Sequence, residues 1–524
     1  MSKWLKGVNP FIYLILIMGL AFFLRLVQMS FPLRFDPGMY SYASWMISIG
    51  ERPYRDFFLT KTPLMHFLNA VPMLFFGPSI YIFLLVETLI VCLSLFLIYH
   101  IVWYISRDYW LALCAALLYA LYSSKYAFSM GGGATENYVV FFNLVALWIA
   151  VKTNLARPSL TALFFFGVAI GCAALARQTG LISVLAWSIF WILNPWIAAR
   201  RGQAFIAYTC GYISVFIIFG LYLVGTDSLH DFLDINFVHN KAYGTGELTD
   251  RGWLQGNKNL LVNMIKTTSP LLPFVFVGLY QLDRYWILVI VMGLASLIEV
   301  FALGTTALIH YGSIALPSVC ILTAKGMRAI LTGVGSVLET RNPIPIFLVL
   351  MVLLYGGLNP LSHASFLRAR LVNLLKGNEL FMADNFVIYK VANELHTRLS
   401  DEQPFGYWGY HRQISMLARR RSLREHSFFH WFTMDLPSGQ RVAKEAEFVL
   451  AIKRHWPKIV VVETNPLNLF YKIPKPPDSL MSLLSENYRL VGTHGPSSKS
   501  VGNFRTYNHI SFHIWELREG EGQS

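Results

Sequence analysis

The segment FIYLILIMGLAFFLRLVQ, residues 11–28, contains only one charged residue, Arg25. A helix needs about 20 predominantly apolar residues to cross the hydrocarbon core of a bilayer, and this segment approaches that length. No small-x-small cleavage site follows it. We therefore expect a retained membrane helix with a cytoplasmic N-terminus, and not a cleaved signal peptide.

The composition extends this conclusion to much of the chain. Hydrophobic residues make up 55% of the 524 positions and charged residues 14%, which predicts a polytopic membrane protein and not a soluble domain with one anchor. The net charge of +14 comes from basic residues dispersed over short loops and the tail, so no nucleic-acid partner is expected. All five cysteines lie in apolar segments and are expected to pack as small apolar residues.

Apolar runs separated by short polar breaks predict about eleven membrane spans. They lie near residues 10–29, 79–105, 110–128, 137–152, 159–176, 180–198, 204–224, 269–282, 285–303, 309–325 and 344–360. The eighth is short. A helical bundle of this kind makes the fold mainly α.

Alternate threading of these spans places most loop charges on one side. The basic residues on that side are Lys3, Lys6, Arg107, Lys152, Arg157, Arg200, Arg201, Arg284, Lys325, Arg328 and Arg341, against the acidic residues Asp108, Asp283 and Glu339. This excess of basic residues is the positive-inside pattern and indicates the cytoplasmic side. The opposite face then carries residues 30–78, 131–136, 225–268 and everything after about 361.

Two further parts of the chain are expected on that opposite face. Residues 37–50 have a pattern suited to an amphipathic helix in the membrane interface, which would hold Asp36 at headgroup depth. After Pro360 the composition becomes that of a small soluble α/β domain, with helices near 379–398 and 440–455 and strands near 405–408, 459–462 and 511–515. We therefore divide the chain into a transmembrane part, 1–360, and an extracytoplasmic domain, 361–524. No Gly-x-Gly-x-x-Gly or Walker loop supports nucleotide binding.

A set of short motifs carries the functional signal. They are Asp36-Pro37-Gly38-Met39-Tyr40, Tyr54-Arg55-Asp56-Phe57, Lys61-Thr62-Pro63-Leu64, Thr135-Glu136-Asn137, Arg177-Gln178-Thr179, His310-Tyr311 with Pro317, and Tyr407-Trp408-Gly409-Tyr410 in the tail. In their order and shared sidedness the chain resembles membrane glycosyltransferases of the GT-C class, specifically the protein mannosyltransferases and aminoarabinose transferases that use polyprenyl-phosphate sugars.

The resemblance implies roles for two carboxylates. Asp36 matches the general base that takes the proton of the acceptor hydroxyl, and Glu136 matches the acidic residue that orients the acceptor or completes a metal site. Many relatives have Asp-Glu in the first loop, whereas Pro37 follows Asp36 here, which weakens a metal site within this loop. No cofactor is predicted, and a divalent metal remains open. The alternative for Asp36 is an N-cap of the interfacial helix, a role compatible with catalysis.

The remaining candidate residues would contact the donor or the acceptor. Cations at the membrane surface suit a phosphate leaving group, so donor-phosphate binding is assigned to Lys61, Arg177 and Arg55. The pair His310-Tyr311 resembles the family position near the lipid phosphate, so both residues are assigned there too, with the Tyr311 hydroxyl as a hydrogen-bond donor. Arg177 could instead snorkel or pair, Asp56 could pair with Arg55 or with another loop residue, and His310 could be structural. Acceptor or sugar contact is assigned to Tyr40, Asp56, Asn137 and His239.

Two other patterns have simpler interpretations. The run Arg419-Arg420-Arg421 is interpreted as a solvated basic patch, with attraction to anionic lipid or an acidic glycan as the alternative. His230, Asp231 and His239 could in principle bind zinc, but no zinc site is predicted.

These observations predict an integral-membrane inverting glycosyltransferase of the plasma (inner) membrane. It would move a sugar from a polyprenyl-phosphate carrier to a lipid, glycan or protein acceptor on the outer face. The alternatives are a flippase or transporter of lipid-linked sugars, which would more naturally carry ionisable residues near mid-membrane, and a non-catalytic assembly subunit. Neither the sugar nor the acceptor can be read from the sequence.

Overall fold

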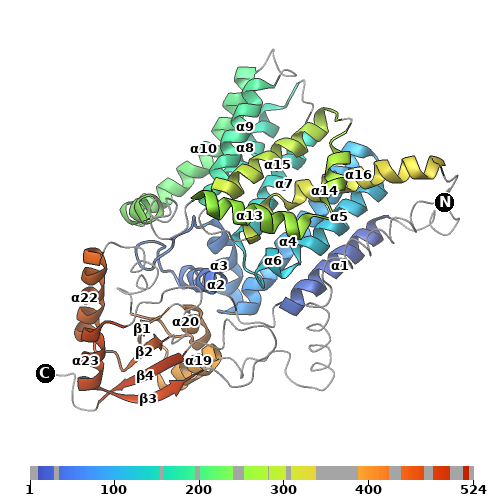
Figure 1. Cartoon of the computed structure of the whole chain (residues 1–524). Coiled ribbons are helices and arrows are strands. Elements are labelled where there is room, and N and C mark those ends of the chain that lie inside the picture. Colours follow the sequence, from blue (N-terminus) through green and yellow to red (C-terminus); the bar gives the residue numbers. More distant parts are fainter. Residues whose placement is uncertain are drawn as a thin grey trace.

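The computed structural model describes residues 10–28, 33, 35–153, 157–194, 201–239, 253–280, 282–302, 309–337, 387–409, 411–423, 438–464, 476–495 and 511–518. They form a large helical part and a smaller C-terminal domain built around a sheet (Figure 1). Helices α2 and α3 lie between these two parts, so the first loop of the chain is enclosed by both.

The helices of the large part follow the apolar runs of the sequence. They are α1 (Pro10–Gln28), α4 (Ile80–Ser106), α5 (Tyr109–Ser123), α6 (Tyr126–Ser129), α7 (Thr135–Lys152), α8 (Leu160–Ala176), α9 (Leu181–Leu193), α10 (Arg201–Gly225), α11 (Leu229–Leu233), the π-helix η3 (Asp234–His239), α13 (Trp253–Thr268), α14 (Leu272–Gly278), α15 (Arg284–Ala302) and α16 (Leu316–Val337), with short 3₁₀ turns η1 (Gln178–Gly180) and η4 (Ile309–Ile314). Each predicted span except 344–360, which lies outside the described residues, coincides with one or two of these helices.

Not every apolar helix is long enough to cross a membrane. Among the described residues, three helices are long and apolar enough to cross a membrane: α4, α10 and α15. A fourth span is possible if α13 and α14, bent by 87° at their junction, form one broken crossing. Several other apolar helices are shorter, so the eleven predicted spans remain a prediction.

Local sequence explains how these helices begin and pack. Ser79 caps α4 by accepting a hydrogen bond from the Tyr81 amide at 3.2 Å, and Asp108 caps α5 through the Trp110 amide at 2.9 Å. Gly167 of α8 and Gly211 of α10 face the backbone of the opposite helix, where a Cβ atom would collide with a carbonyl oxygen. Small residues at these points let the two helices approach closely, as in other membrane bundles.

The first loop folds differently from the predicted interfacial helix. Helix α2 (Phe35–Ser48) is present, but it is buried on both sides, between α3 (Leu64–Phe76) and α20 (Gln413–Ala418). Its small polar residues are compatible with burial because Ser41 and Ser44 donate hydrogen bonds to carbonyl oxygens of their own helix, each at 2.8 Å. The predicted helix is therefore present, but its burial contradicts an amphipathic helix with one side facing lipid; its depth relative to the membrane stays a prediction.

The C-terminal domain contains a four-stranded sheet in the order β1-β2-β4-β3. Its elements are α19 (Val387–Arg398), β1 (Gly406–Trp408), α20, α22 (Ser438–His455), β2 (Ile459–Thr464), α23 (Asp478–Asn487), β3 (Tyr488–His494) and β4 (Ser511–Leu517). Strands β1 and β2 are parallel, and β4 pairs antiparallel with β2 and β3. The predicted strands are confirmed. Strand β3 was not predicted, since its residues lack a continuous apolar run and all but Tyr488 are exposed or half-buried.

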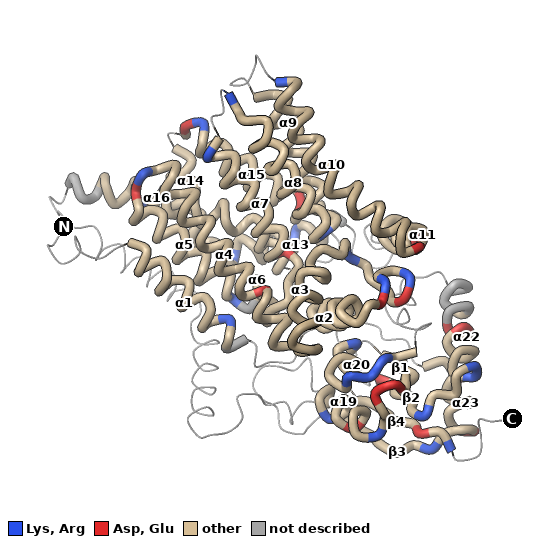
Figure 2. Tube along the Cα trace, turned by 180° about the vertical axis from the view of Figure 1, so that it is seen from behind, with Lys and Arg blue, Asp and Glu red and all other residues tan. Residues whose placement is uncertain are grey.

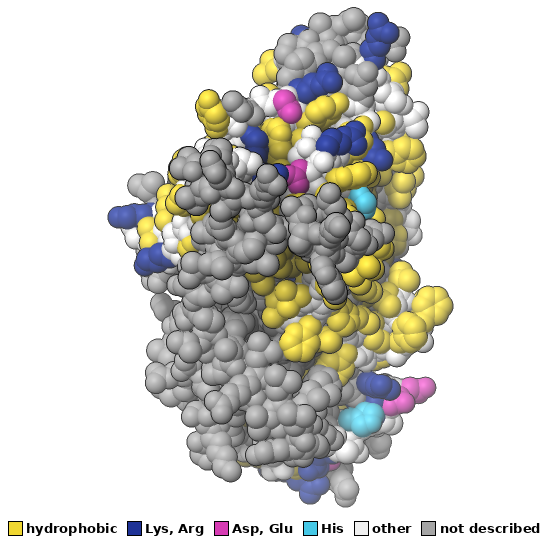
Figure 3. Space-filling view, turned by 90° about the vertical axis from the view of Figure 1, so that its right-hand side faces the viewer, with side chains coloured by type: hydrophobic (Ala, Val, Ile, Leu, Met, Phe, Trp, Pro, Cys, Tyr) yellow, Lys and Arg dark blue, Asp and Glu magenta, His cyan; other side chains and the backbone are white. Residues whose placement is uncertain are grey.

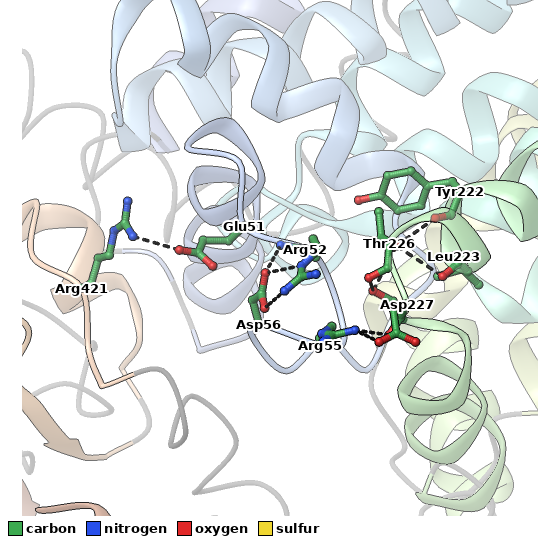
Figure 4. A network of polar contacts seen from close by, with 10 residues as sticks. Glu51, Arg52, Arg55, Asp56, Tyr222, Leu223, Thr226, Asp227 and Arg421 are labelled. Atoms are coloured by element: carbon green, nitrogen blue, oxygen red, sulfur yellow. Dashed lines mark hydrogen bonds and ion pairs between the residues drawn. The ribbon is translucent and has the colours of Figure 1, made fainter. Parts of the chain in front are cut away.

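The basic run of this domain is not simply solvated. Arg420 is buried and donates to the Leu399 carbonyl at 2.8 Å, and Arg421 pairs with Glu51 of the first loop at 2.9 Å. Figure 4 shows the Arg421–Glu51 pair between the domain and the loop. The interpretation as a solvated patch is therefore corrected for Arg420, which is buried in the domain, whereas Arg419 and Arg421 are exposed and Arg421 also contacts the first loop.

Charged loop residues meet at one end of the helical part. Arg328 pairs with Asp108 at 2.9 Å and Lys325 donates to the Tyr280 carbonyl at 2.6 Å, so loops predicted to share the cytoplasmic side do meet at one end (Figure 2). Among the described residues, hydrophobic side chains gather on the right-hand side of the view in Figure 3, and Phe76 of α3 is 77% exposed. An extended apolar surface of this kind is typical of contact with lipid.

Candidate active site

A pocket opens where five separate segments of the chain meet. Its lining consists of Asp36, Pro37, Tyr40, Lys61, Met130, Gly133, Ala134, Thr135, Glu136, Arg177, His310 and Tyr311. The N-terminal part of α2 supplies Asp36, Pro37 and Tyr40, and the loop before α3 supplies Lys61. The glycine loop, residues 130–134, leads into α7. Arg177 follows the end of α8, and η4 supplies the histidine and tyrosine.

The glycine loop has positive φ angles, which residues with a side chain rarely adopt. Gly131, Gly132 and Gly133 have φ angles of 86°, 105° and 82°, a region that glycine enters without steric cost. A Cβ atom on Gly133 would lie 2.7 Å from the side chain of Pro37 and 2.6 Å from the ring of Phe83. The absence of a side chain at this position therefore lets the loop bearing Glu136 touch the loop bearing Asp36.

We expect Gly133→Ala to impair this contact. Overpacking costs about 1–3 kcal/mol, and the new methyl group would push Pro37 and its neighbour Asp36 aside, so melting temperature and activity should both fall. The matched control is Gly77→Ala, because Gly77 has a similar φ of 79° but open space around its Cβ position. Equal losses in both variants would mean that backbone strain, and not contact between the loops, is responsible.

Glu136 and Arg177 form a buried ion pair at the centre of the pocket. Glu136 lies in the first turn of α7, where its carboxylate also accepts from the Thr135 hydroxyl at 3.2 Å and lies 4.0 Å from His310 Nε2. The Arg177 guanidinium stacks 4.3 Å from the centre of the Tyr311 ring. Since one arginine carries five N–H donors, the pair leaves donors for a second anion.

Lys61 is held at the pocket through its backbone. Its carbonyl accepts from the Tyr54 hydroxyl at 2.9 Å, and the adjacent Thr62 donates to the Ala174 carbonyl at 3.2 Å. Burial lowers the pKa of the Lys61 ammonium, as does the charge of Arg177, whereas the carboxylates of Asp36 and Glu136 act in the opposite direction. Burial and the same two carboxylates hold the pKa of the Tyr40 hydroxyl well above its usual value.

The structure brings together many of the predicted site residues. Asp36, Tyr40, Lys61, Glu136, Arg177, His310 and Tyr311 all line the pocket. Helix α2 begins at Phe35, so Asp36 lies within its first turn and not at the N-cap position. Arg177 makes the ion pair that the sequence left open as an alternative, while still facing the pocket.

Other predicted residues lie elsewhere. Arg55 points away and pairs with Asp227 at the end of α10, and Asp56 accepts two hydrogen bonds from the Arg52 side chain at 2.9 and 3.0 Å (Figure 4). Asn137 donates to Glu87 beneath the glycine loop. Their polar groups are thus used to hold loops in place, and donor binding by Arg55 is corrected on this ground. His239 ends η3, and its side chain lies outside the described residues.

Sequence reasoning missed several buried polar residues around the pocket. Glu87 of α4 pairs with Arg25 of α1 at 3.4 Å, and Glu299 of α15 accepts from the Thr179 hydroxyl at 2.5 Å. Both glutamates lie within predicted spans, and a carboxylate inside an apolar run is itself a signal of function or pairing. That signal was present in the sequence and was not used.

The described residues include no cluster suited to a metal ion. No group of three or more histidine, cysteine, aspartate or glutamate side chains in this part of the chain could hold one. Glu136 is already engaged by Arg177, so the open alternative of a divalent metal gains no support from these residues.

Comparison with known proteins identifies the fold. The fold is similar to that of two crystal structures of ArnT from Cupriavidus metallidurans, one bound to undecaprenyl phosphate and one in the apo state. Each superposes with a TM-score of 0.56 at 13% sequence identity. The match covers 95% of this chain and 97% of the ArnT chain. No protein-family model and no curated protein matches the sequence. The chain therefore has an ArnT-like fold, and the resemblance to the GT-C class seen in the sequence is confirmed at the level of the fold.

Proposed function

We propose that the protein is an integral-membrane inverting glycosyltransferase that uses a polyprenyl-phosphate sugar and acts on the outer face of the membrane. The observation that carries this proposal is the meeting of Asp36, Lys61, Glu136 and Arg177 in one pocket, although they come from four separate segments. The crystal structure of ArnT bound to undecaprenyl phosphate, which shares this fold, supports a carrier of that chemical class.

The chemistry follows from the charges around the pocket. Asp36 accepts the proton of the acceptor hydroxyl while the acceptor oxygen bonds to the anomeric carbon from the face opposite the phosphate. The bond between the anomeric carbon and the phosphate oxygen breaks, and its electron pair leaves with the polyprenyl phosphate. A single displacement inverts the anomeric centre. Lys61 and Arg177 stabilise the negative charge that develops on the phosphate.

Glu136 has a positioning role in this scheme. Its carboxylate fixes one side of the Arg177 guanidinium, so the remaining N–H donors are held in a defined direction. The Tyr311 ring supports the guanidinium from its face. Preorganised cations cost little reorganisation when the leaving group acquires its charge.

The direct test of the function is a comparison of lipids from cells with and without the gene. We expect a polyprenyl-phosphate sugar to accumulate when the gene is absent and one glycoconjugate to lose that sugar, which would identify donor and acceptor together. A flippase predicts donor trapped on the cytoplasmic leaflet, so the accumulated lipid should also be assayed for sidedness. Unchanged lipids and glycoconjugates would exclude both activities.

We expect donor affinity to depend on pH through Lys61. Its lowered pKa means that the ammonium is lost at a lower pH than the ordinary value of 10.5, so affinity for undecaprenyl phosphate should weaken as the pH rises toward that value. The phosphate is already fully ionised above about pH 8 and adds no trend of its own. Binding titrations between about pH 8 and pH 10 would measure the effect.

Unfolding would not explain such a loss. A buried lysine whose folded-state pKa is lowered favours the neutral amine, so its contribution to folding stability increases as the pH rises through that pKa. The control is Lys61→Met, which should bind undecaprenyl phosphate more weakly and without this pH dependence. The same pH profile in both proteins would exclude Lys61 as its origin.

A further inference from the structure

Glu87 is an unusual residue for its place in the fold. It lies about two turns into α4, one of the helices long and apolar enough to cross a membrane, and its side chain is 1% exposed. A carboxylate in such surroundings is costly unless charges and hydrogen-bond donors compensate it. The contacts that compensate Glu87 therefore indicate what it does.

Those contacts converge on the glycine loop. One Glu87 oxygen accepts from the Gly133 amide at 2.7 Å, and the other accepts from the Ala134 amide at 3.2 Å and from Asn137 Nδ2 at 2.5 Å. Successive backbone amides in left-handed or turn conformations form a concave site for an anion. In this protein the anion is a side chain of the chain itself, and it is not among the residues that line the pocket.

Arg25 of α1 contacts the same carboxylate. Its Nη1 lies 3.4 Å from Glu87, and its Nη2 donates to the Ser123 carbonyl at the end of α5 at 3.1 Å. The chain of contacts thus runs from α1 and α5 through Glu87 to the loop. The loop continues directly into Thr135 and Glu136, which line the pocket, and Gly133 packs against Pro37 beside Asp36.

We infer that Glu87 is a positioning residue that holds the glycine loop so that Glu136 and Asp36 keep their places across the pocket. This inference rests on the proposed function for its catalytic consequence. The contacts through which Glu87 holds the glycine loop, called the clamp below, can be tested without that function. Displacement of a catalytic group by about 1 Å can cost about 10²-fold in rate. Loss of the clamp should therefore act on the rate of transfer more than on donor binding.

The variant that tests the clamp is Glu87→Gln, which keeps the shape of the side chain. An amide presents an NH2 group where the loop and Arg25 offer only donors, so the hydrogen bonds to Gly133 and Ala134 cannot all persist. We expect faster hydrogen exchange of the amides of residues 132–134. In reconstituted vesicles supplied with donor lipid from cells lacking the gene, the transfer rate should fall roughly 10- to 100-fold, while affinity for undecaprenyl phosphate changes less than about 3-fold.

A second variant separates positioning from general stability. Arg25→Met combined with Glu87→Met removes both buried charges, a change that often leaves stability near that of the original pair. Positioning predicts a melting temperature near wild type with fast exchange at residues 132–134 and slow transfer. Wild-type exchange in folded Glu87→Gln, or recovery of transfer in the double variant, would overturn the inference. If even the wild-type protein transfers no sugar, the proposed function fails, and the exchange measurement still decides whether the clamp exists.

Discussion

Replacement of Asp36 by asparagine is expected to abolish sugar transfer while leaving the protein in the membrane at its normal amount. Asparagine keeps the size of the side chain but cannot accept the proton of the acceptor hydroxyl. General-base catalysis typically contributes about 10²- to 10⁴-fold to a rate, so the loss should be at least of that order. Affinity for undecaprenyl phosphate should remain close to normal, because the positive groups of the pocket are intact.

Transfer and binding must be measured on the same purified protein to support this assignment. Glu402→Gln is the control, since it makes the same change of carboxylate to amide at an exposed position of the C-terminal domain. Asp36→Asn with full activity would remove the base assignment. A loss of melting temperature equal to the loss of activity would instead point to a structural role in the first turn of α2.

The second large effect is expected from Arg177→Met. The substitution removes the arginine that pairs with the buried Glu136, and breaking such a buried pair typically costs about 3–5 kcal/mol. It also removes the planar donors that would bind the donor phosphate. We therefore expect a marked fall in melting temperature together with loss of affinity for undecaprenyl phosphate.

A double variant separates the two consequences. Adding Glu136→Gln to Arg177→Met removes the unpaired charge, so stability should largely return while undecaprenyl phosphate affinity stays low. Arg284→Met, at the exposed start of α15, serves as the matched arginine control. Recovery of affinity in the double variant would show that Arg177 only compensates Glu136 and does not bind phosphate.

Much of the helical part could be predicted because membrane helices follow directly from apolar runs. The candidate site could be anticipated for a related reason. Threading of the spans placed Asp36, Lys61, Glu136 and Arg177 near one face of the bundle, and the structure brings these four residues to one pocket. Their motifs are individually common, so their shared sidedness was the informative property.

The errors arose where three-dimensional pairing decides the outcome. Nothing adjacent to Arg55 in sequence reveals its partner Asp227, which lies 172 residues further along the chain. The burial of α2 depends on contact with α20 of the C-terminal domain, and a pattern of mixed polarity is compatible with either a lipid interface or such a contact. The sequence marks Glu87 as a carboxylate inside an apolar run, but its partners could not be predicted, because two of them are backbone amides and Arg25 and Asn137 lie 62 and 50 residues away along the chain.

The central claim is that the cations and carboxylates of this one pocket surround the phosphate and the reacting carbon of a lipid-linked sugar. The most direct test is an experimental structure of the protein in a lipid bilayer with undecaprenyl phosphate bound. The account predicts phosphate oxygens within about 4 Å of both Lys61 Nζ and the Arg177 guanidinium, on the side of the pocket facing Asp36. A phosphate bound elsewhere, with these two side chains unchanged and Asp36 remote from it, would contradict the account.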